Sequence, residues 1–219
     1  MVRVGLFVCA ALSFILLPSA ASAQTEPGPI PVFAADVRLA LPRFKADPAV
    51  ASVLAVAPTD LPTLGLGFVA GAHIYPLRTK AITFGLGAEF LRSRARRTKP
   101  PATEGGVEGP AVRTRLSGVS PQVSFNFGHR DGWSYISGGM GWMSLTSVIE
   151  TTGPAGADDD AARSKTINYG GGARWFATKH VAVSLDLRFY AVSPRTATAT
   201  DRGYPRMTVM VFTGGLAFR

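Results

Sequence analysis

The sequence predicts an all-β protein that folds as one closed, eight-stranded, antiparallel up-and-down β-barrel. Three observations lead to this fold class. Eight segments alternate between apolar and polar residues with the period of two that a β-strand requires. The connections between these segments alternate strictly between long and short. Beyond the N-terminal leader, no apolar run approaches the roughly 20 residues that a membrane helix needs.

The first residues have the composition of an export signal. Arg3 precedes an apolar run over 4–17, which is too short to span a bilayer as a helix. Pro18 ends this run, and the small residues at 21–23 (Ala-Ser-Ala) match the pattern that signal peptidase accepts. We therefore expect a cleaved signal peptide over 1–23 and export through the inner membrane.

The remaining residues, 24–219, have a suitable length for a single domain. The one cysteine of the chain, Cys9, lies in the predicted signal, so disulfides and thiolate metal sites are not expected in the mature protein. The formal net charge of +9 suggests an anionic partner, and export makes nucleic acid an improbable one. Lipid headgroups remain as the expected anions.

The predicted strands share one pattern, which is clearest at 181–189. Odd positions there are apolar, and even positions are small or charged. An apolar face opposite a face of Gly, Ser, Asn and isolated charges is typical of a membrane barrel, with apolar residues toward lipid and polar residues toward the lumen. The eight predicted strands are 32–43, 62–76, 80–96, 111–127, 132–149, 163–177, 179–193 and 206–219.

The connections indicate which end of the barrel faces outward. Membrane barrels have short periplasmic turns and longer outer loops, so the long connections 44–61, 97–110, 150–162 and 194–205 are predicted at the outer end. Both termini then fall on the periplasmic side. Aromatic residues near that end predict an interfacial girdle, which a soluble β-sandwich would not concentrate at its strand ends. They are Tyr75, Phe127, Trp133, Trp175, Phe176 and Phe218.

Glycine-rich apolar pieces recur along the chain, and the last strand ends on an aromatic residue followed by Arg219. The pieces are 64–67, 84–87, 138–142 and 169–172, and the last strand covers 208–218. In these features the chain resembles the small outer-membrane β-barrel family of OmpA/OmpX-like proteins. The resemblance implies residence in the bacterial outer membrane, insertion by the barrel assembly machinery, and a monomer. It also implies a C-terminal assembly signal formed by Met210, Phe212, Leu216 and Phe218.

Six charged residues share the inward parity of the strands. An eight-stranded barrel is just wide enough for side chains to fill it, so these groups should be poorly hydrated and should pair with one another. We interpret them as a structural salt-bridge network rather than a proton or ion path. They are Asp36, Arg38, Glu89, Arg174, Asp186 and Arg188.

The three histidines do not predict an enzyme or a metal centre. His129 and His180 fall in periplasmic turns, and His73 falls near the periplasmic end of its strand. An acyl-transfer or protease site would need a histidine base at the outer rim. Scattered histidines without nearby carboxylates also make a poor metal site. We therefore expect neither catalysis nor a cofactor.

An arginine cluster is the feature that suggests a ligand. A strand tilted by about 40° climbs roughly 2.5 Å per residue, so an apolar band of about 25 Å ends just before the cluster. Its members point outward from one predicted hairpin: Arg92, Arg94, Arg96, Arg113 and Arg115. Facing like charges oppose strand pairing unless an anion lies between them. In an outer leaflet that anion would be a phosphate of lipid A, the membrane anchor of lipopolysaccharide, and the alternative is a solvated basic rim.

Taken together, the residues predict an integral outer-membrane protein with a structural or surface-interaction role. Its outer loops and basic rim would contact lipopolysaccharide or external partners. Two alternatives stay open at this point: a narrow channel for small solutes, and a soluble exported ligand-binding barrel of the lipocalin type. The apolar stretch Val50–Val56 falls in a predicted outer loop and suggests a short helix or a strand extension over the barrel mouth.

Overall fold

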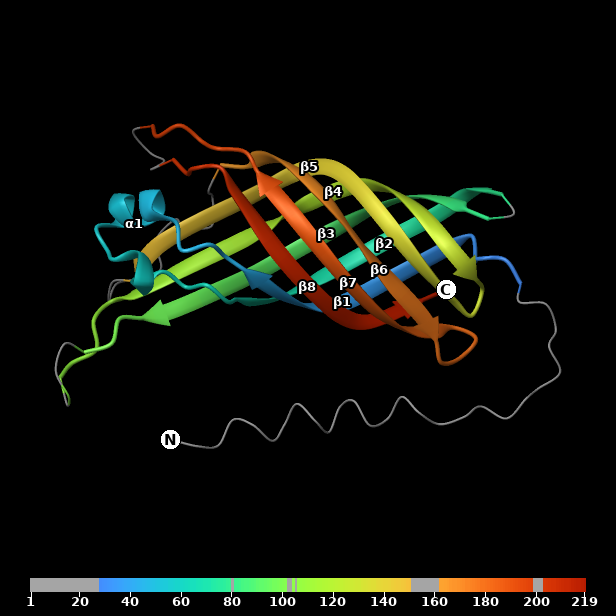
Figure 1. Cartoon of the computed structure of the whole chain (residues 1–219), viewed down its shortest axis with the longest axis horizontal. Helices are drawn as coiled ribbons and strands as arrows, with labels where there is room; N and C mark the ends of the chain where they lie inside the picture. The colour runs from blue at the N-terminus through green and yellow to red at the C-terminus, as the bar shows by residue number, and fades with distance from the viewer. Residues whose placement is uncertain (1–27, 80, 102–103, 105, 151–161, 199–202) are drawn as a thin grey trace.

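The computed structural model describes residues 28–79, 81–101, 104, 106–150, 162–198 and 203–219, so the predicted signal peptide lies outside the described residues. Eight antiparallel strands form a closed barrel in the order β1 to β8 (Figure 1). The strands are β1 (Phe33–Arg43), β2 (Leu66–Arg78), β3 (Thr83–Thr98), β4 (Ala111–His129), β5 (Gly132–Glu150), β6 (Ser164–Phe176), β7 (Val181–Val192) and β8 (Met207–Phe218). A helix, α1 (Pro48–Leu54), and a 3-10 helix, η1 (Pro58–Asp60), lie between β1 and β2.

The predicted fold class and all eight predicted strands are confirmed, with boundaries that differ by a few residues at most. The sheet closes where β1 pairs with β8, for example between Val37 and Leu216. Each pair of neighbouring strands is antiparallel and consecutive in the chain, as an up-and-down barrel requires. Figure 1 shows α1 and the long loops at one end, and the short turns with the C-terminus at the other.

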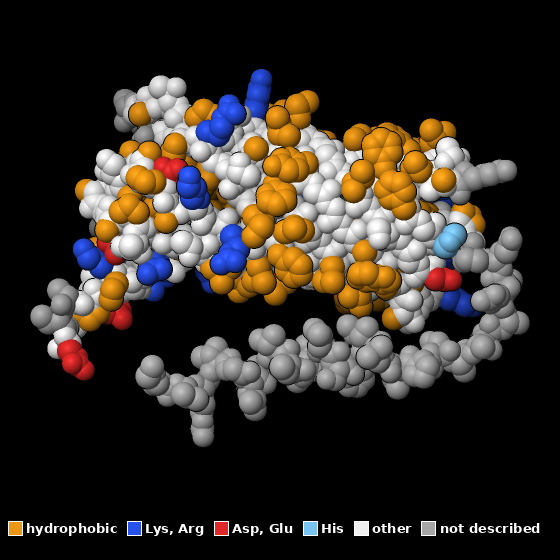
Figure 2. Space-filling model, in the orientation of Figure 1, with side chains coloured by type: hydrophobic (Ala, Val, Ile, Leu, Met, Phe, Trp, Pro, Cys, Tyr) orange, Lys and Arg blue, Asp and Glu red, His pale blue; other side chains and the backbone are white. Residues whose placement is uncertain are grey.

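The outer surface of the barrel is apolar over most of its height. Large apolar side chains of alternate residues are exposed on every strand, among them Leu39, Phe68, Leu86, Val123, Ile136, Ile167, Leu187 and Phe212. On the face that Figure 2 shows, apolar side chains gather toward the turn end and the middle of the barrel, whereas most basic side chains lie nearer the loop end. In the described part of the chain, no helix has the length and apolar character needed to span a bilayer. This apolar belt around a closed sheet is the architecture of a transmembrane β-barrel.

The lumen is filled, and its filling changes character along the barrel axis. Toward the loop end, most inward side chains are apolar and form one buried cluster that includes Leu91, Leu116, Leu145 and Val209, with a few hydroxyls such as that of Thr114 among them. Inward polar and charged groups occupy the lumen nearer the turns. The alternation of the sequence predicted a polar lumen throughout, and for the loop-end half this expectation is wrong. The reason is that a filled lumen excludes water, so apolar side chains pack there as they do in a soluble core.

The helix α1 is the lid of this apolar cluster. Asp47 caps its N-terminus by accepting a hydrogen bond from the backbone N–H of Ala49 at 2.9 Å. Val50, Ala51 and Leu54 point into the cluster and are buried. The apolar stretch at the outer loop is therefore explained as a short helix packed over the barrel mouth.

The predicted aromatic girdle is half correct. Phe127, Trp175 and Phe218 point outward and are 41–53% exposed, as a girdle requires. Tyr75 and Trp133 are instead buried inside the lumen, where their rings meet edge to face. These two residues share the parity of the inward polar side chains, so proximity to a strand end was a poorer guide than parity. With Ile30 they close the turn end of the barrel.

The last strand presents its predicted assembly face outward. Phe212, Leu216 and Phe218 are exposed by 43–47%, and Met210 on the same face is half-buried. Arg219, which follows Phe218, makes several contacts that the sequence did not indicate.

Arg219 joins two of the short turns. Its Nε donates to the carbonyl oxygen of Lys179 at 2.6 Å, and its guanidinium also donates to the carbonyl of Arg130. Its Nη2 lies 3.7 Å from a carboxylate oxygen of Asp131, and its guanidinium carbon lies 3.8 Å from the ring centre of Phe176. The Arg219 side chain is only 6% exposed. It therefore ties the turn before β5 to the turn before β7.

We predict that Arg219→Ala lowers the free energy of unfolding by about 2 kcal/mol, because hydrogen bonds from a charged donor are lost. The measurement is urea unfolding of the purified protein refolded in lipid vesicles. Arg78→Ala, at the exposed C-terminal end of β2, is the matched control and should change little. Equal stability of the Arg219 variant and the parent would show that the contacts at the turns contribute nothing.

Candidate functional site

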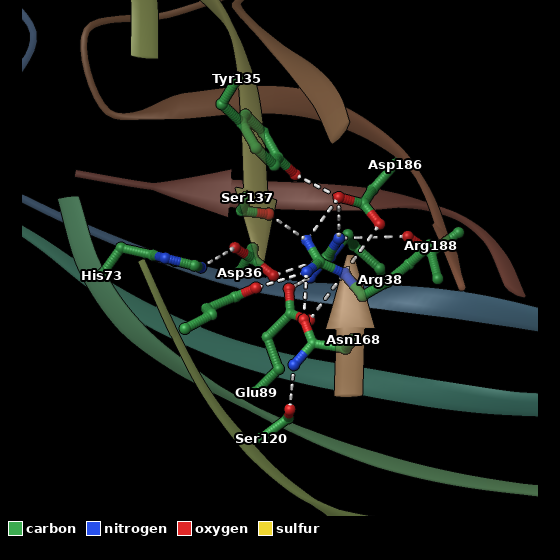
Figure 3. A network of polar contacts seen from close by, with 12 residues as sticks. Asp36, Arg38, His73, Glu89, Ser120, Tyr135, Ser137, Asn168, Asp186 and Arg188 are labelled. Atoms are coloured by element: carbon green, nitrogen blue, oxygen red, sulfur yellow. Dashed lines mark hydrogen bonds and ion pairs between the residues drawn. The ribbon is translucent and has the colours of Figure 1, made fainter. Parts of the chain in front are cut away.

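A network of buried charges crosses the lumen at its polar level, and Figure 3 shows most of its members. Three carboxylates and three guanidinium groups meet there, each in a residue that is at most 2% exposed. These are the six residues that alternation assigned to the lumen: Asp36, Arg38, Glu89, Arg174, Asp186 and Arg188. The structure places all six together, and their formal charges cancel.

Arg38 of β1 contacts all three acids. Its Nε donates to Asp36 Oδ1 at 2.8 Å, and its Nη2 donates to Glu89 Oε1. Its Nη1 lies 3.6 Å from Asp186 Oδ2 and donates to Thr213 Oγ1 at 3.2 Å. Gly71 on β2 leaves room for the Asp36 carboxylate, because a Cβ at this position would lie only 3.0 Å from it.

Arg188 of β7 forms the second centre of the network. Its Nη2 lies 3.0 Å from Asp186 Oδ2, and its Nε lies 3.2 Å from Glu89 Oε2. Neutral groups satisfy its remaining donors, since it donates to Asn168 Oδ1 at 2.8 Å and to Ser137 Oγ at 2.8 Å. Every charge is thus paired, which is the condition for burying charges at tolerable cost.

Arg174 of β6 extends the network toward the turns. Its Nη2 donates to Asp36 Oδ2 at 2.6 Å, and its Nη1 donates to the hydroxyl of Tyr75 at 2.7 Å. The hydroxyl of Tyr135 donates to Asp186 Oδ2 at 2.9 Å, and His73 Nε2 lies 3.7 Å from Asp36 Oδ2. His73 was predicted only near the periplasmic end of its strand, and it is enclosed in the lumen.

Neutral side chains, among them Tyr75 of β2, bring in strands that supply none of the six charged residues. Gln122 belongs to β4, Ser137 to β5 and Thr213 to β8, so every strand supplies a contact. Sequence reasoning missed these neutral partners. The alternation of each strand indicated that these side chains face inward. It did not indicate which residues they contact across the lumen.

The basic rim, defined as Arg92, Arg94, Arg96, Arg113 and Arg115, lies at the loop end of β3 and β4. All five side chains point outward, as predicted; those on β3 are exposed and those on β4 half-buried. The register places the guanidinium-bearing residues opposite one another, with Arg94 paired to Arg115 and Arg96 paired to Arg113. Like charges thus face each other in two successive rows of the hairpin.

One of these rows has an anion of its own, which the sequence analysis did not identify. Glu150, at the end of β5 beyond the apolar belt, lies 2.7 Å from Arg96 Nε and 3.2 Å from Arg113 Nη1. The hydrogen bond from Arg96, together with both positive charges, holds the pKa of the Glu150 carboxyl below its ordinary value. It is therefore ionised at neutral pH and neutralises part of the upper row.

The two rim arginines of β3 nearer the apolar belt lack such an internal anion. Within the described part of the chain, Arg92 and Arg94 have no carboxylate within salt-bridge distance. Both are exposed, and neither has the internal carboxylate that Arg96 has. An anion that approaches from the membrane side reaches them before the upper row.

A hollow of about 570 Å³ adjoins the rim on the outside of the barrel. Leu41, Leu64 and Leu66, from β1 and the chain leading into β2, line one side. The arginines of β3 and β4 line the other side, together with Glu150 of β5. Leu66 pairs directly with Arg94, so an aliphatic surface and a cationic surface lie at the same height. The hollow is open on its outer side rather than enclosed.

No protein-family model matches the chain, and no curated protein matches it. Among solved structures it is similar to neisserial surface protein A, with 11% identity, a TM-score of 0.47, and coverage of 85% of this chain and 94% of that one. The outer membrane protein OprG from Pseudomonas aeruginosa is 8% identical, with a TM-score of 0.47 and coverage of 88% of this chain and 97% of that one. The outer membrane protease OmpT from Escherichia coli is 11% identical, with a TM-score of 0.44 and coverage of 85% of this chain and 96% of that one. Identities this low, with TM-scores below 0.5, say nothing about what this chain binds.

We predict that Arg188→Ala lowers the free energy of unfolding by about 3–5 kcal/mol, because Glu89 and Asp186 stay buried and each loses one of its two guanidinium partners. Arg130→Ala in an exposed turn should cost far less. The measurement is the urea midpoint in lipid vesicles, with the parent as reference. Equal effects of the two substitutions would mean that Arg188 is hydrated rather than enclosed.

Proposed function

We propose that this chain is an integral outer-membrane β-barrel protein with a structural and surface-interaction role, whose basic rim contacts lipopolysaccharide. One observation carries the proposal: a closed barrel with an apolar belt bears outward arginines where that belt ends. A phosphate of lipid A offers the anion that facing arginines need, and guanidinium groups bind phosphate through two donors. A monomer suffices for this role, because closure leaves no strand edge to pair with a second copy.

The filled lumen argues against the channel alternative. The apolar cluster under α1 occupies the loop end, and the cluster with Tyr75 and Trp133 occupies the turn end. Between them the charge network links all eight strands. Ion flow would require these side chains to separate, which would leave buried charges unpaired.

The outer surface argues against a soluble ligand-binding barrel. Leu39, Ile136 and Met140 are among the many large apolar side chains that would face water, with exposures of 55–73%. Soluble monomers rarely expose apolar patches larger than a few hundred Å². We also propose that the role is not enzymatic, which is supported by the enclosure of His73 and by the positions of His129 and His180 at the turns.

We predict that the protein is recovered in the outer-membrane fraction and is released only by detergent, because its apolar belt requires lipid. Fractionation of cells that express the full chain, followed by gel mobility with and without heating, provides the measurement. Recovery in the supernatant without detergent would contradict the membrane assignment.

We predict that replacing all five rim arginines by Gln sharply lowers the lipopolysaccharide that co-purifies, since the positive charge is lost while long polar side chains remain. Glu150→Gln should have the opposite effect, because it releases Arg96 and Arg113 from their internal anion. Arg206→Gln, an exposed residue before β8, is the control. If the five-fold variant retains the lipopolysaccharide of the parent, the rim is only a solvated basic surface.

A further inference from the structure

The upper border of the apolar belt is uneven around the barrel. On β3 and β4 the outward residues change from apolar to charged or polar just above Phe90 and Val119. On the β2 side the apolar surface continues higher, since Phe68 pairs with Arg92 and Leu66 pairs with Arg94. Aliphatic side chains therefore stand beside guanidinium groups at one height, instead of below them.

This juxtaposition forms the open groove beside the rim. Its aliphatic wall consists of Leu41, Leu64 and Leu66, of which the last two are 59% and 56% exposed. Its cationic wall includes Arg94, which has no carboxylate partner in the described part of the chain, and Arg96, which is held by Glu150. A simple phosphate ion would leave the leucines exposed, and an uncharged chain would leave Arg94 without an anion.

The ligand that fits both walls carries an acyl chain and a phosphate close together. We propose that this groove is a discrete site for one lipid A molecule, with an acyl chain along Leu64 and Leu66 and a phosphate on Arg94. This inference rests on the proposed function and deepens it, because it replaces diffuse attraction to a basic rim by a single site of defined walls. Glu150 limits the site from above, since its carboxylate occupies Arg96 and Arg113 and repels a phosphate placed there.

The test is a binding titration of the purified full chain in detergent micelles with fluorescently labelled diphosphoryl lipid A. One molecule per chain should bind. Leu66→Ser should weaken binding at least tenfold, and Arg94→Gln should do the same. Ile167→Ser is the matched control, because Ile167 on β6 points outward with the same 56% exposure and lies outside the groove. Arg206→Gln is the control for charge.

Three competitors define the occupant. Unlabelled diphosphoryl lipid A should displace the probe, whereas inorganic phosphate and phosphatidylglycerol should not. Displacement by phosphatidylglycerol at equal concentration would overturn the assignment to lipid A in favour of any acylated phosphate. Arg94 provides a second check if Leu66→Ser fails to fold, because its loss should matter for diphosphoryl lipid A and not for the dephosphorylated lipid.

The result can separate the groove from the rim as a whole. If Leu66→Ser binds as tightly as the parent while Arg94→Gln binds more weakly, the groove is wrong and the basic rim stands. If the variant with five Gln substitutions binds as tightly as the parent, the proposed contact of the rim with lipopolysaccharide fails, and the groove fails with it.

Discussion

Pairing between β1 and β8 turns an open sheet into a closed barrel, and closure imposes both an outer and an inner requirement. Outside, the sheet has no free edge, so every strand can satisfy its backbone groups in lipid and present apolar side chains to it. Inside, eight strands enclose a space that side chains must fill. Arg38 and Asp36 lie on β1 two and four residues from Ala40, a member of the apolar cluster, so one strand serves both kinds of filling. The lumen and the belt are thus two consequences of one closed sheet.

The charge network adds specificity to that closure. A buried ion pair seldom exceeds a well-packed apolar pair in stability, because both charges must leave water. Its particular contribution is that a wrong strand register becomes costly. If β7 shifted by one residue, Asp186 and Arg188 would face lipid and Glu89 would lose one of its two guanidinium partners. The apolar cluster at the loop end would tolerate exchanges among residues such as Leu91 and Val209 more readily. The polar side chains in the lumen therefore fix the strand register, and the apolar side chains close the loop end of the barrel.

Strand number, strand boundaries and the inward set of charges were predictable, because each depends on a period of two that the sequence displays directly. The apolar lining of the lumen at the loop end was not predictable, since Leu91 and Leu116 face inward as apolar residues and interrupt the alternation. Tyr75 and Trp133 were wrongly predicted to face lipid, because the prediction relied on their nearness to a strand end and not on their inward position in the alternation. Glu150 was missed for a different reason: its contact with Arg96 joins residues 54 positions apart, and no local pattern encodes such a pair.

The uneven border of the belt follows from the way the hairpins end. The chain between β1 and β2 returns through α1, which must reach the barrel mouth to seal the apolar cluster with Val50 and Leu54. That return leaves Leu64 outside the barrel, bridged to Arg43 of β1, so aliphatic surface extends above the level where β3 turns basic. The lid and the groove are therefore linked: the segment that closes the lumen from above also supplies an aliphatic wall beside Arg94.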